Sequence, residues 1–157
     1  MTRERFIELV TAEQEPLRRF LLGLCGGNRM EADDIAQDTL IKAYLASDEY
    51  VERYKFSTWL FKIGYHTFID YQRRPNRQLS PLDDTIPGGA PSDAAFAYED
   101  LYRAIDTLPV KTRSAILLFY INGYSVLEIS RIMGSTPIAV RKQLSRGREQ
   151  LRKILKR

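Results

Sequence analysis

A break in composition near the middle of the chain divides its 157 residues into two parts. Four of the seven prolines lie between positions 75 and 94, together with two glycines and three aspartates. Such a segment lacks the apolar periodicity of a packed element, so it predicts a flexible, acidic linker rich in Pro and Gly. We therefore expect two small domains, over residues 1–75 and 97–157, joined by a linker over 76–96.

The first part is predicted to be helical. Apolar residues recur at helical spacing over 6–25, where Pro16 should kink or restart the helix and Gly26 should end it. A second helix is expected over 31–46, and nothing in this part indicates a strand. Two helices are therefore expected before position 47.

A third helix is predicted over 57–73 of the first part. Ser57 is a plausible N-cap, and Phe56 before it is placed to pack on Phe61 as a hydrophobic staple. The first domain is therefore expected to contain three helical segments.

The second part is predicted to hold four helices, which makes the expected fold class all-α. One helix covers 101–108, and Pro109 suits the first turn of the next, which should end before Gly123. The last two helices are the most clearly delimited elements in the sequence.

Those two helices have the caps and the spacing of a helix-turn-helix. Ser125 and Glu128 have the spacing of a capping box, and Gly134 suits the left-handed end of that short helix. Thr136 is then predicted to cap a long final helix with Pro137 at its first position. Two helices joined by a tight turn that contains glycine are typical of a DNA-binding motif.

Positive charge is concentrated in the same region. Residues 101–157 carry 12 basic and 3 acidic residues, although the whole chain has a net charge of only +4. On the predicted final helix, which Thr136 caps, four polar or basic residues share a face that can enter the major groove: Arg141, Lys142, Ser145 and Arg146. A basic face that is merely solvated is the alternative, but the charge favours a polyanionic partner.

One face of the predicted helix over 31–46 mixes acidic and aliphatic side chains. It carries Asp34, Gln37, Asp38 and Ile41, a composition that favours a protein-binding surface. Asp33 with its neighbouring aspartates offers a metal site as an alternative. No histidine or cysteine accompanies them, so no metal is expected.

Aromatic and basic residues alternate over 44–74. This pattern is typical of single-stranded nucleic-acid binding, in which bases stack on rings and cations hold the backbone. Core packing is the favoured explanation for the aromatics when the segment is taken alone, with Trp59, Ile63 and Phe68 at helical spacing.

Taken together, these segments resemble the extracytoplasmic-function (ECF) group of the sigma-70 family of bacterial RNA polymerase sigma factors. The resemblance spans nearly the whole chain and lies in Glu31–Tyr44, Phe56–Ile63, Phe68–Arg74, Leu108-Pro109 with Arg113, Gly123–Ser125, Glu128-Ile129, Gly134, Val140-Arg141 and Arg146–Arg148. Each piece is only moderately specific, but their order and their separation by a linker make the resemblance strong.

The resemblance implies a division of roles. Residues 1–75 would bind the beta and beta-prime subunits of core RNA polymerase through Asp34, Gln37, Asp38 and Ile41. They would also melt and bind the minus-ten element, through Lys55, Trp59, Lys62, Tyr65, His66, Arg73 and Arg74. Residues 97–157 would bind the minus-thirty-five element through Thr136, Arg141, Lys142, Ser145 and Arg146.

His66 falls where members of the family often place a polar residue that lines the pocket for a flipped base. A lone histidine on a packed helix is the alternative for this residue. The resemblance also allows an anti-sigma protein as a partner, which no residue of the sequence identifies.

Other functional classes find little support in the sequence. No pairing of nucleophile and base, no phosphate-binding glycine loop and no ligand set is present, so no enzymatic activity and no cofactor are expected. No apolar run is long enough to insert in a membrane, and the single cysteine, Cys25, is expected to be a core residue in a cytoplasmic protein. A stand-alone helix-turn-helix regulator and a metal-dependent nucleic-acid-processing enzyme remain the alternatives, and whether the two domains touch is open.

Overall fold

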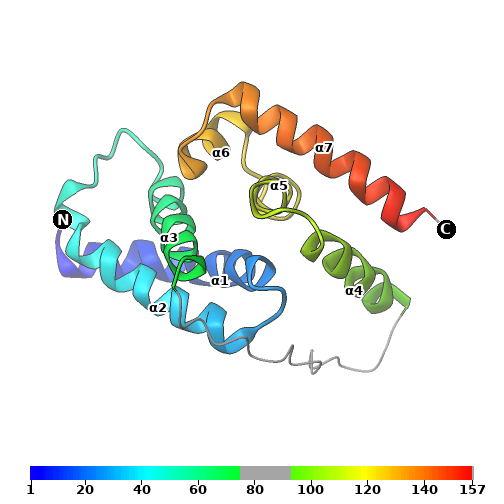
Figure 1. The fold of residues 1–157 in the computed structure, drawn as a ribbon. Helices are drawn as coiled ribbons and strands as arrows, with labels where there is room; N and C mark the ends of the chain where they lie inside the picture. Colours follow the sequence, from blue (N-terminus) through cyan, green and yellow to red (C-terminus); the bar gives the residue numbers. More distant parts are fainter. Residues whose placement is uncertain (75–92, 157) are drawn as a thin grey trace.

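The computed structural model describes residues 1–74 and 93–156, with the side chains of 93–98 excepted. All regular elements in these ranges are helical (Figure 1). In chain order they are α1 (Arg3–Leu24), α2 (Arg29–Leu45), a 3-10 turn η1 (Ser47–Glu49), α3 (Phe56–Gln72), α4 (Asp93–Asp106), α5 (Val110–Ile116), a π-helical turn η2 (Leu117–Ile121), α6 (Val126–Met133) and α7 (Pro137–Leu155). The all-α prediction is therefore confirmed for the described residues.

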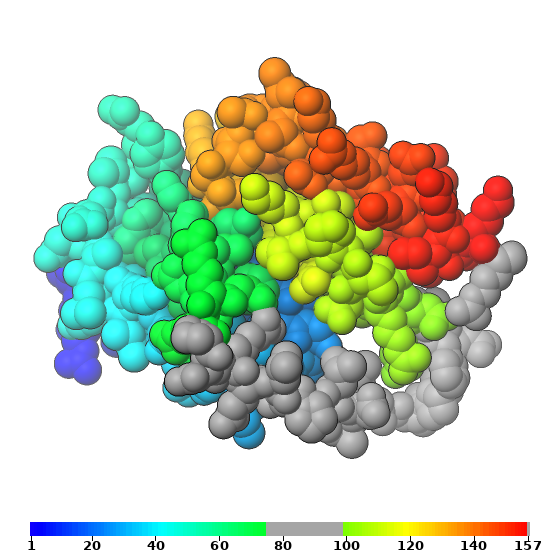
Figure 2. Space-filling model, viewed as in Figure 1, coloured from blue at the N-terminus to red at the C-terminus, as the bar shows by residue number. Residues whose placement is uncertain are grey.

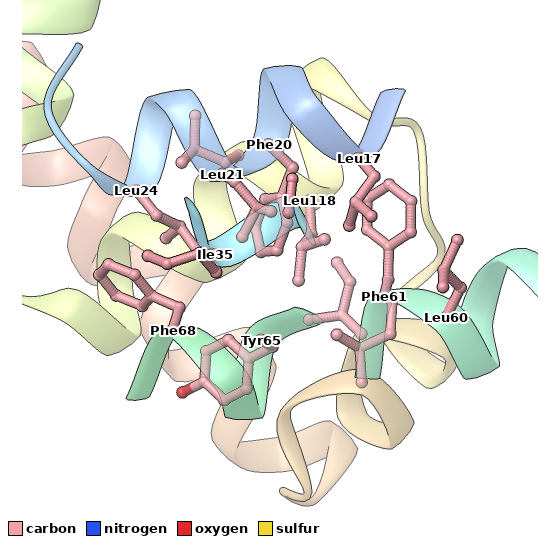
Figure 3. Close-up of a cluster of buried hydrophobic side chains, with 14 of the residues drawn as sticks. Leu17, Phe20, Leu21, Leu24, Ile35, Leu60, Phe61, Tyr65, Phe68 and Leu118 are labelled. Atoms are coloured by element: carbon pink, nitrogen blue, oxygen red, sulfur yellow. The ribbon is translucent and has the colours of Figure 1, made fainter. Parts of the chain in front are cut away.

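Helices α1 to α3 pack on one another and form the first lobe. Their core is fully buried, and within it the rings of Phe20 and Phe61 stack with centroids 5.4 Å apart (Figure 3). Ile35 and Phe68 bring α2 and α3 into the same core. Apolar positions that recur at helical spacing in all three helices thus meet along one seam.

Helix α1 runs unbroken through Pro16, although the sequence predicted a kink or a restart there. A proline inside a helix removes one amide donor and costs about 3 kcal/mol. Val10 before it and Leu17 and Phe20 after it are all buried in the same core. Because each such side chain contributes about 1.5–3 kcal/mol when buried, packing on both sides of the proline offsets its cost. The helix ends before Gly26, whose φ of 62° is left-handed, as predicted.

Helix α3 begins two residues earlier than the predicted N-cap at Ser57 allows. Lys55 occupies the N-cap position and makes no capping hydrogen bond with its side chain. Phe56 is buried and its ring meets Tyr50 edge-on at 5.5 Å, whereas Phe61 stacks on Phe20 instead. Burial of Phe56 therefore decides where the helix starts, and the predicted staple between Phe56 and Phe61 is wrong.

Helices α4 to α7 form the second lobe. The helix α4 begins at Asp93, so the last residues of the predicted linker over 76–96 are helical; positions 75–92 lie outside the described residues. Helices α5 and α7 approach closely at Gly147, where a Cβ atom would lie 2.7 Å from Ile116 Cγ1. The hydroxyl of Thr112 donates to Gln143 Oε1 at 2.6 Å beside this contact. Glycine thus sets the distance between the two helices.

The two lobes touch and share one continuous core. Leu118 of η2 lies among the side chains of the first lobe in Figure 3, and the ring of Tyr124 meets Phe61 at 5.1 Å. The guanidinium of Arg113 donates to the carbonyl oxygen of Leu24 at 2.8 Å, across the same boundary. Contact between the lobes, which the sequence left open, is present in this structure.

We expect Gly147→Ala to destabilise the protein, because its Cβ would press on Ile116 Cγ1 and on Thr112 Cγ2 at 3.0 Å. Overpacking of this kind costs about 1–3 kcal/mol, more than the gain of about 1 kcal/mol that alanine brings to a helix. Urea unfolding measures the change, with the exposed Gln150→Ala on the same helix as the control. A Gly147→Ala variant as stable as the parent would contradict the close approach.

Candidate nucleic-acid and polymerase interfaces

The helix-turn-helix predicted from the sequence is present, with every predicted cap in place. Ser125 Oγ accepts from the amide of Glu128 at 3.2 Å, and Glu128 Oε1 accepts from the amide of Ser125 at 3.1 Å, which completes the capping box. Gly134 ends α6 with φ 65°. Thr136 Oγ1 accepts from the amide of Ala139 at 3.1 Å, and Pro137 begins α7.

One side of α7 packs in the protein and the other is open. Val140 and Leu144 are buried against α6 and α5, with Ile129 and Ile132 on the facing side of α6. The four predicted DNA contacts on α7 are all exposed: Arg141, Lys142, Ser145 and Arg146. Figure 2 shows α7, in orange to red, along the outer edge of the molecule. The structure thus brings the predicted residues together on one open surface.

The predicted polymerase-binding residues also share an open surface, on α2. Asp34 and Gln37 are exposed, and Ile41 and Leu45 expose 59% and 78% of their surface. Asp38 is half-buried, and its Oδ2 accepts from the hydroxyl of Tyr71 at 2.9 Å. The result is a fixed carboxylate beside two exposed aliphatic side chains, a composition suited to a protein partner.

The neighbouring aspartates are engaged with other side chains. Asp33 Oδ1 lies 3.0 Å from Arg18 Nη2, and Asp38 is held by Tyr71. In the part of the chain that the structure describes, no three acidic, histidine or cysteine side chains are grouped to hold a metal. The carboxylates of this surface are arranged as separate partners for cations and donors.

The predicted minus-ten residues fall into three groups on and around α3. Lys62, His66, Arg73 and Arg74 are exposed, with the Arg74 guanidinium 4.2 Å from the centre of the Tyr71 ring. His66 Nδ1 donates to the carbonyl oxygen of Lys62 at 2.7 Å, which leaves Nε2 directed away from that bond. These four side chains are open to a nucleic-acid strand.

Trp59 and Tyr65 are packed instead. Trp59 is half-buried between Tyr50 and Phe56, whose ring centroids are 5.4 and 5.5 Å from its own. Core packing, the explanation that the sequence favoured for this residue, accounts for its position. Tyr65 exposes only 4% of its surface, and burial raises the pKa of its hydroxyl. A strand can stack on Tyr65 only after the side chains that cover it have moved.

Helix α6 covers this part of α3. Glu128 Oε2 lies 3.3 Å from Lys55 Nζ and accepts from the Thr58 hydroxyl at 3.5 Å. The ring of Tyr124 packs on Phe61, and burial raises the pKa of Tyr124 to about 12 against a hydrogen bond with Ser57 that lowers it. Lys55, a predicted minus-ten residue, is thus paired with the helix-turn-helix.

The sequence did not reveal this contact, although it identified Glu128 as a capping residue. Glu128 serves the capping box with one oxygen and the α3 contact with the other. Tyr124 precedes the N-cap and packs across to Phe61. Next to a helix cap, an acidic residue and a large aromatic residue are explained by local capping and packing. No signal in the sequence therefore indicated that they also contact α3.

The comparisons with known proteins identify the family. The Sigma-70 region 2 model matches residues 9–78 and the Sigma-70, region 4 model matches residues 98–151. The ECF RNA polymerase sigma factor SigW of Bacillus subtilis is 34% identical over 146 residues, which cover 83% of this chain and 78% of the relative. The chain belongs to the ECF RNA polymerase sigma factors.

Two solved structures resemble the chain along nearly its whole length. The sigma factor RpoE of Bartonella quintana, solved in complex with the anti-sigma factor NepR, aligns over 98% of both chains with a TM-score of 0.82 and 26% identity. CnrH, solved with the cytosolic domain of CnrY, aligns over 98% of this chain and 89% of its own, with a TM-score of 0.75 and 25% identity. In this sigma factor, none of the described helices is long and apolar enough to cross a membrane.

Glu128→Gln should weaken the packing of α6 on α3 while keeping the capping box, in which glutamine is an accepted residue. Burial raises the pKa of Glu128, but hydrogen bonds from Ser125 and the Lys55 ion pair outweigh burial and lower it below 4.5. A lowered carboxyl pKa contributes stability that is complete above the unfolded value of 4.5 and lost as the pH falls through the folded value.

Urea unfolding at pH 7 should therefore show Glu128→Gln less stable by about 1 kcal/mol, with the difference decreasing as the pH falls below 4.5. Glu149→Gln, which removes an exposed pair with Lys153 inside the second lobe, is the matched control. A difference that persists unchanged at pH 3 would show that the charge of Glu128 is not what holds α6.

Proposed function

We propose that this chain is an initiation subunit that binds core RNA polymerase and directs it to specific promoters. The observation that carries the proposal is the joint match of sigma-70 region 2 and region 4, in that order, to the two lobes of one chain. A stand-alone helix-turn-helix regulator needs no region 2, so that alternative is not favoured. In this proposal residues 1–75 act as region 2 and 97–157 as region 4.

The open face of α2 is assigned to core polymerase. Its exposed aliphatics, Ile41 and Leu45, would be buried by a partner helix, and Asp34 and Gln37 would fix its orientation. Tyr71 supports this assignment because its hydroxyl holds the Asp38 carboxylate in place before binding. A partner surface of apolar and basic side chains fits this composition.

The open side of α3 is assigned to the melted minus-ten strand. Lys62, Arg73 and Arg74 provide positive charge for the phosphates, and His66 presents a ring nitrogen beside them. Lys55 would join this site only when α6 leaves α3, because it is paired with Glu128. Tyr65 would join it only after the side chains that bury it have moved. Promoter melting in this proposal thus requires the lobes to separate.

The open face of α7 is assigned to the minus-thirty-five duplex. Arg141, Lys142 and Arg146 carry the positive charge that phosphates and guanine edges attract, and Ser145 lies among them. Thr136 contributes mainly as the cap of α7, since its hydroxyl already accepts from Ala139. Recognition is the contribution of this chain, and the chemistry of RNA synthesis would belong to the polymerase.

An anti-sigma protein is a further proposed partner. The sigma factor RpoE of Bartonella quintana was crystallised with an anti-sigma factor, NepR, and CnrH was solved with the cytosolic domain of a second protein, CnrY. The likeness of this chain to each over its full length supports the same class of partner here.

In vitro transcription tests the proposed function directly. Purified bacterial core polymerase with this chain should yield transcripts from a subset of promoters in a genomic library, and core alone should not. A chain that neither binds core nor permits initiation at any promoter would overturn the proposal.

Different mutations should separately impair promoter binding by the second lobe and core-polymerase binding by the first. Arg141→Ala or Arg146→Ala should weaken promoter binding by about 1–3 kcal/mol and leave core binding intact, because both side chains lie on the open face of α7. Gln37→Ala with Asp38→Ala should do the reverse. Filter binding to promoter DNA and pull-down of core polymerase measure the two activities.

Tyr71→Phe is compared with the second variant, because it removes only the hydrogen bond to Asp38. It should weaken core binding less than the double variant, because Asp38 keeps its charge and Gln37 is unchanged; equal losses would show that the position of Asp38 decides binding. Loss of core binding in Arg141→Ala would contradict the division of roles.

A further inference from the structure

An exposed aliphatic side chain lies at the N-terminal end of the basic face of α7. Ile138 is the second residue of the helix and exposes 66% of its surface. Arg141, Lys142 and Ser145 follow it at the helical spacings i+3, i+4 and i+7, and all three are exposed. Ile138 therefore lies on the same face of α7 as these three residues.

The packing of α7 on the rest of the lobe does not require isoleucine at position 138. Val140 and Leu144, which attach α7 to the rest of the lobe, expose 1% and 2% of their surface and lie on the opposite side of the helix. Isoleucine is also a weaker helix former than alanine, lysine or glutamate because its branched side chain loses rotamer freedom. A polar residue would serve the helix better.

Exposure of one aliphatic residue is ordinary on a protein surface, so its surroundings must identify a partner. Arg141 and Lys142 lie one helical turn from Ile138 and place positive charge beside it, which favours a polyanion over an apolar protein surface. The N-terminal residues of a recognition helix are those that meet base edges in the major groove. The apolar group on those edges is the C5-methyl of thymine.

We propose that Ile138 contacts the methyl group of one thymine in the minus-thirty-five element and makes thymine preferred at that position. This inference rests on the proposed binding of α7 to that element. Arg141 and Lys142 hold the helix on the duplex, and Ile138 adds selectivity that charge alone does not give. Burial of one methyl group against the side chain corresponds to about fourfold in affinity, from about 0.8 kcal/mol.

Substitution of deoxyuridine for thymine tests the contact, because it removes the methyl group and keeps every hydrogen-bonding group. The holoenzyme is first used to select its preferred promoter from a randomised library. Each thymine of the selected minus-thirty-five element is then replaced singly. We expect one replacement to weaken binding about fourfold with the parent chain and to have no effect with Ile138→Ala.

Ile154→Ala is the matched control, since Ile154 is also an exposed isoleucine of α7 but lies in its last turn. It should retain the full response to deoxyuridine. The inference is overturned if no thymine shows a methyl effect, if the effect survives in Ile138→Ala, or if the selected element holds no thymine. Weaker core binding by Ile138→Ala would also overturn it, in favour of a protein contact.

Failure of the inference and failure of the proposed function give different results. If Arg141→Ala weakens promoter binding while no methyl effect is found, the proposed function stands and the role of Ile138 falls. If the holoenzyme binds no promoter at all, both fall.

Discussion

The packing of α6 against both α3 and α7 determines which surfaces of this sigma factor are covered and which are open. This helix is only eight residues long, too short to be stable alone in water. Its capping box, its left-handed end at Gly134 and the burial of Ile129 and Ile132 hold it in place. Because α7 is fixed on one side of α6, the open face of α7 is directed away from the protein. Because α3 lies on another side, Lys55 is paired with Glu128 of the helix-turn-helix.

The parts of the fold that depend on local chemistry were predictable from the sequence, and the parts that depend on packing were not. The caps at Ser125, Gly134 and Thr136 were predicted because each rests on residues within three or four positions. The start of α3 and the course of α1 through Pro16 depend instead on burial of side chains against distant helices. Where a local preference of about 1–3 kcal/mol opposes the burial of several apolar side chains, burial prevails.

The candidate site shows the same division. Helical spacing correctly grouped the charged residues of α7 and the acidic–aliphatic residues of α2 on open faces. It did not distinguish Tyr65, which is buried, from His66 beside it, which is exposed, because that difference depends on packing and not on local spacing. Ile138 was missed for another reason: charge and capping drew attention to its neighbours, and only its measured exposure distinguishes it from a core residue.

Separation of the lobes, which the proposed function requires, is opposed more by apolar burial than by charge. Lys55 is largely exposed and its pair with Glu128 is therefore worth about 1 kcal/mol or less. The contact of Phe61 with Tyr124 contributes more, since an aromatic pair adds to the area that it removes from water. A promoter phosphate can replace Glu128 as the partner of Lys55 at little cost. The aromatic surface must be covered again by something else, and bases stacked on Tyr65 would do so. In the proposed function, strand binding and lobe closure would thus compete for the aromatic surface of α3 as well as for Lys55.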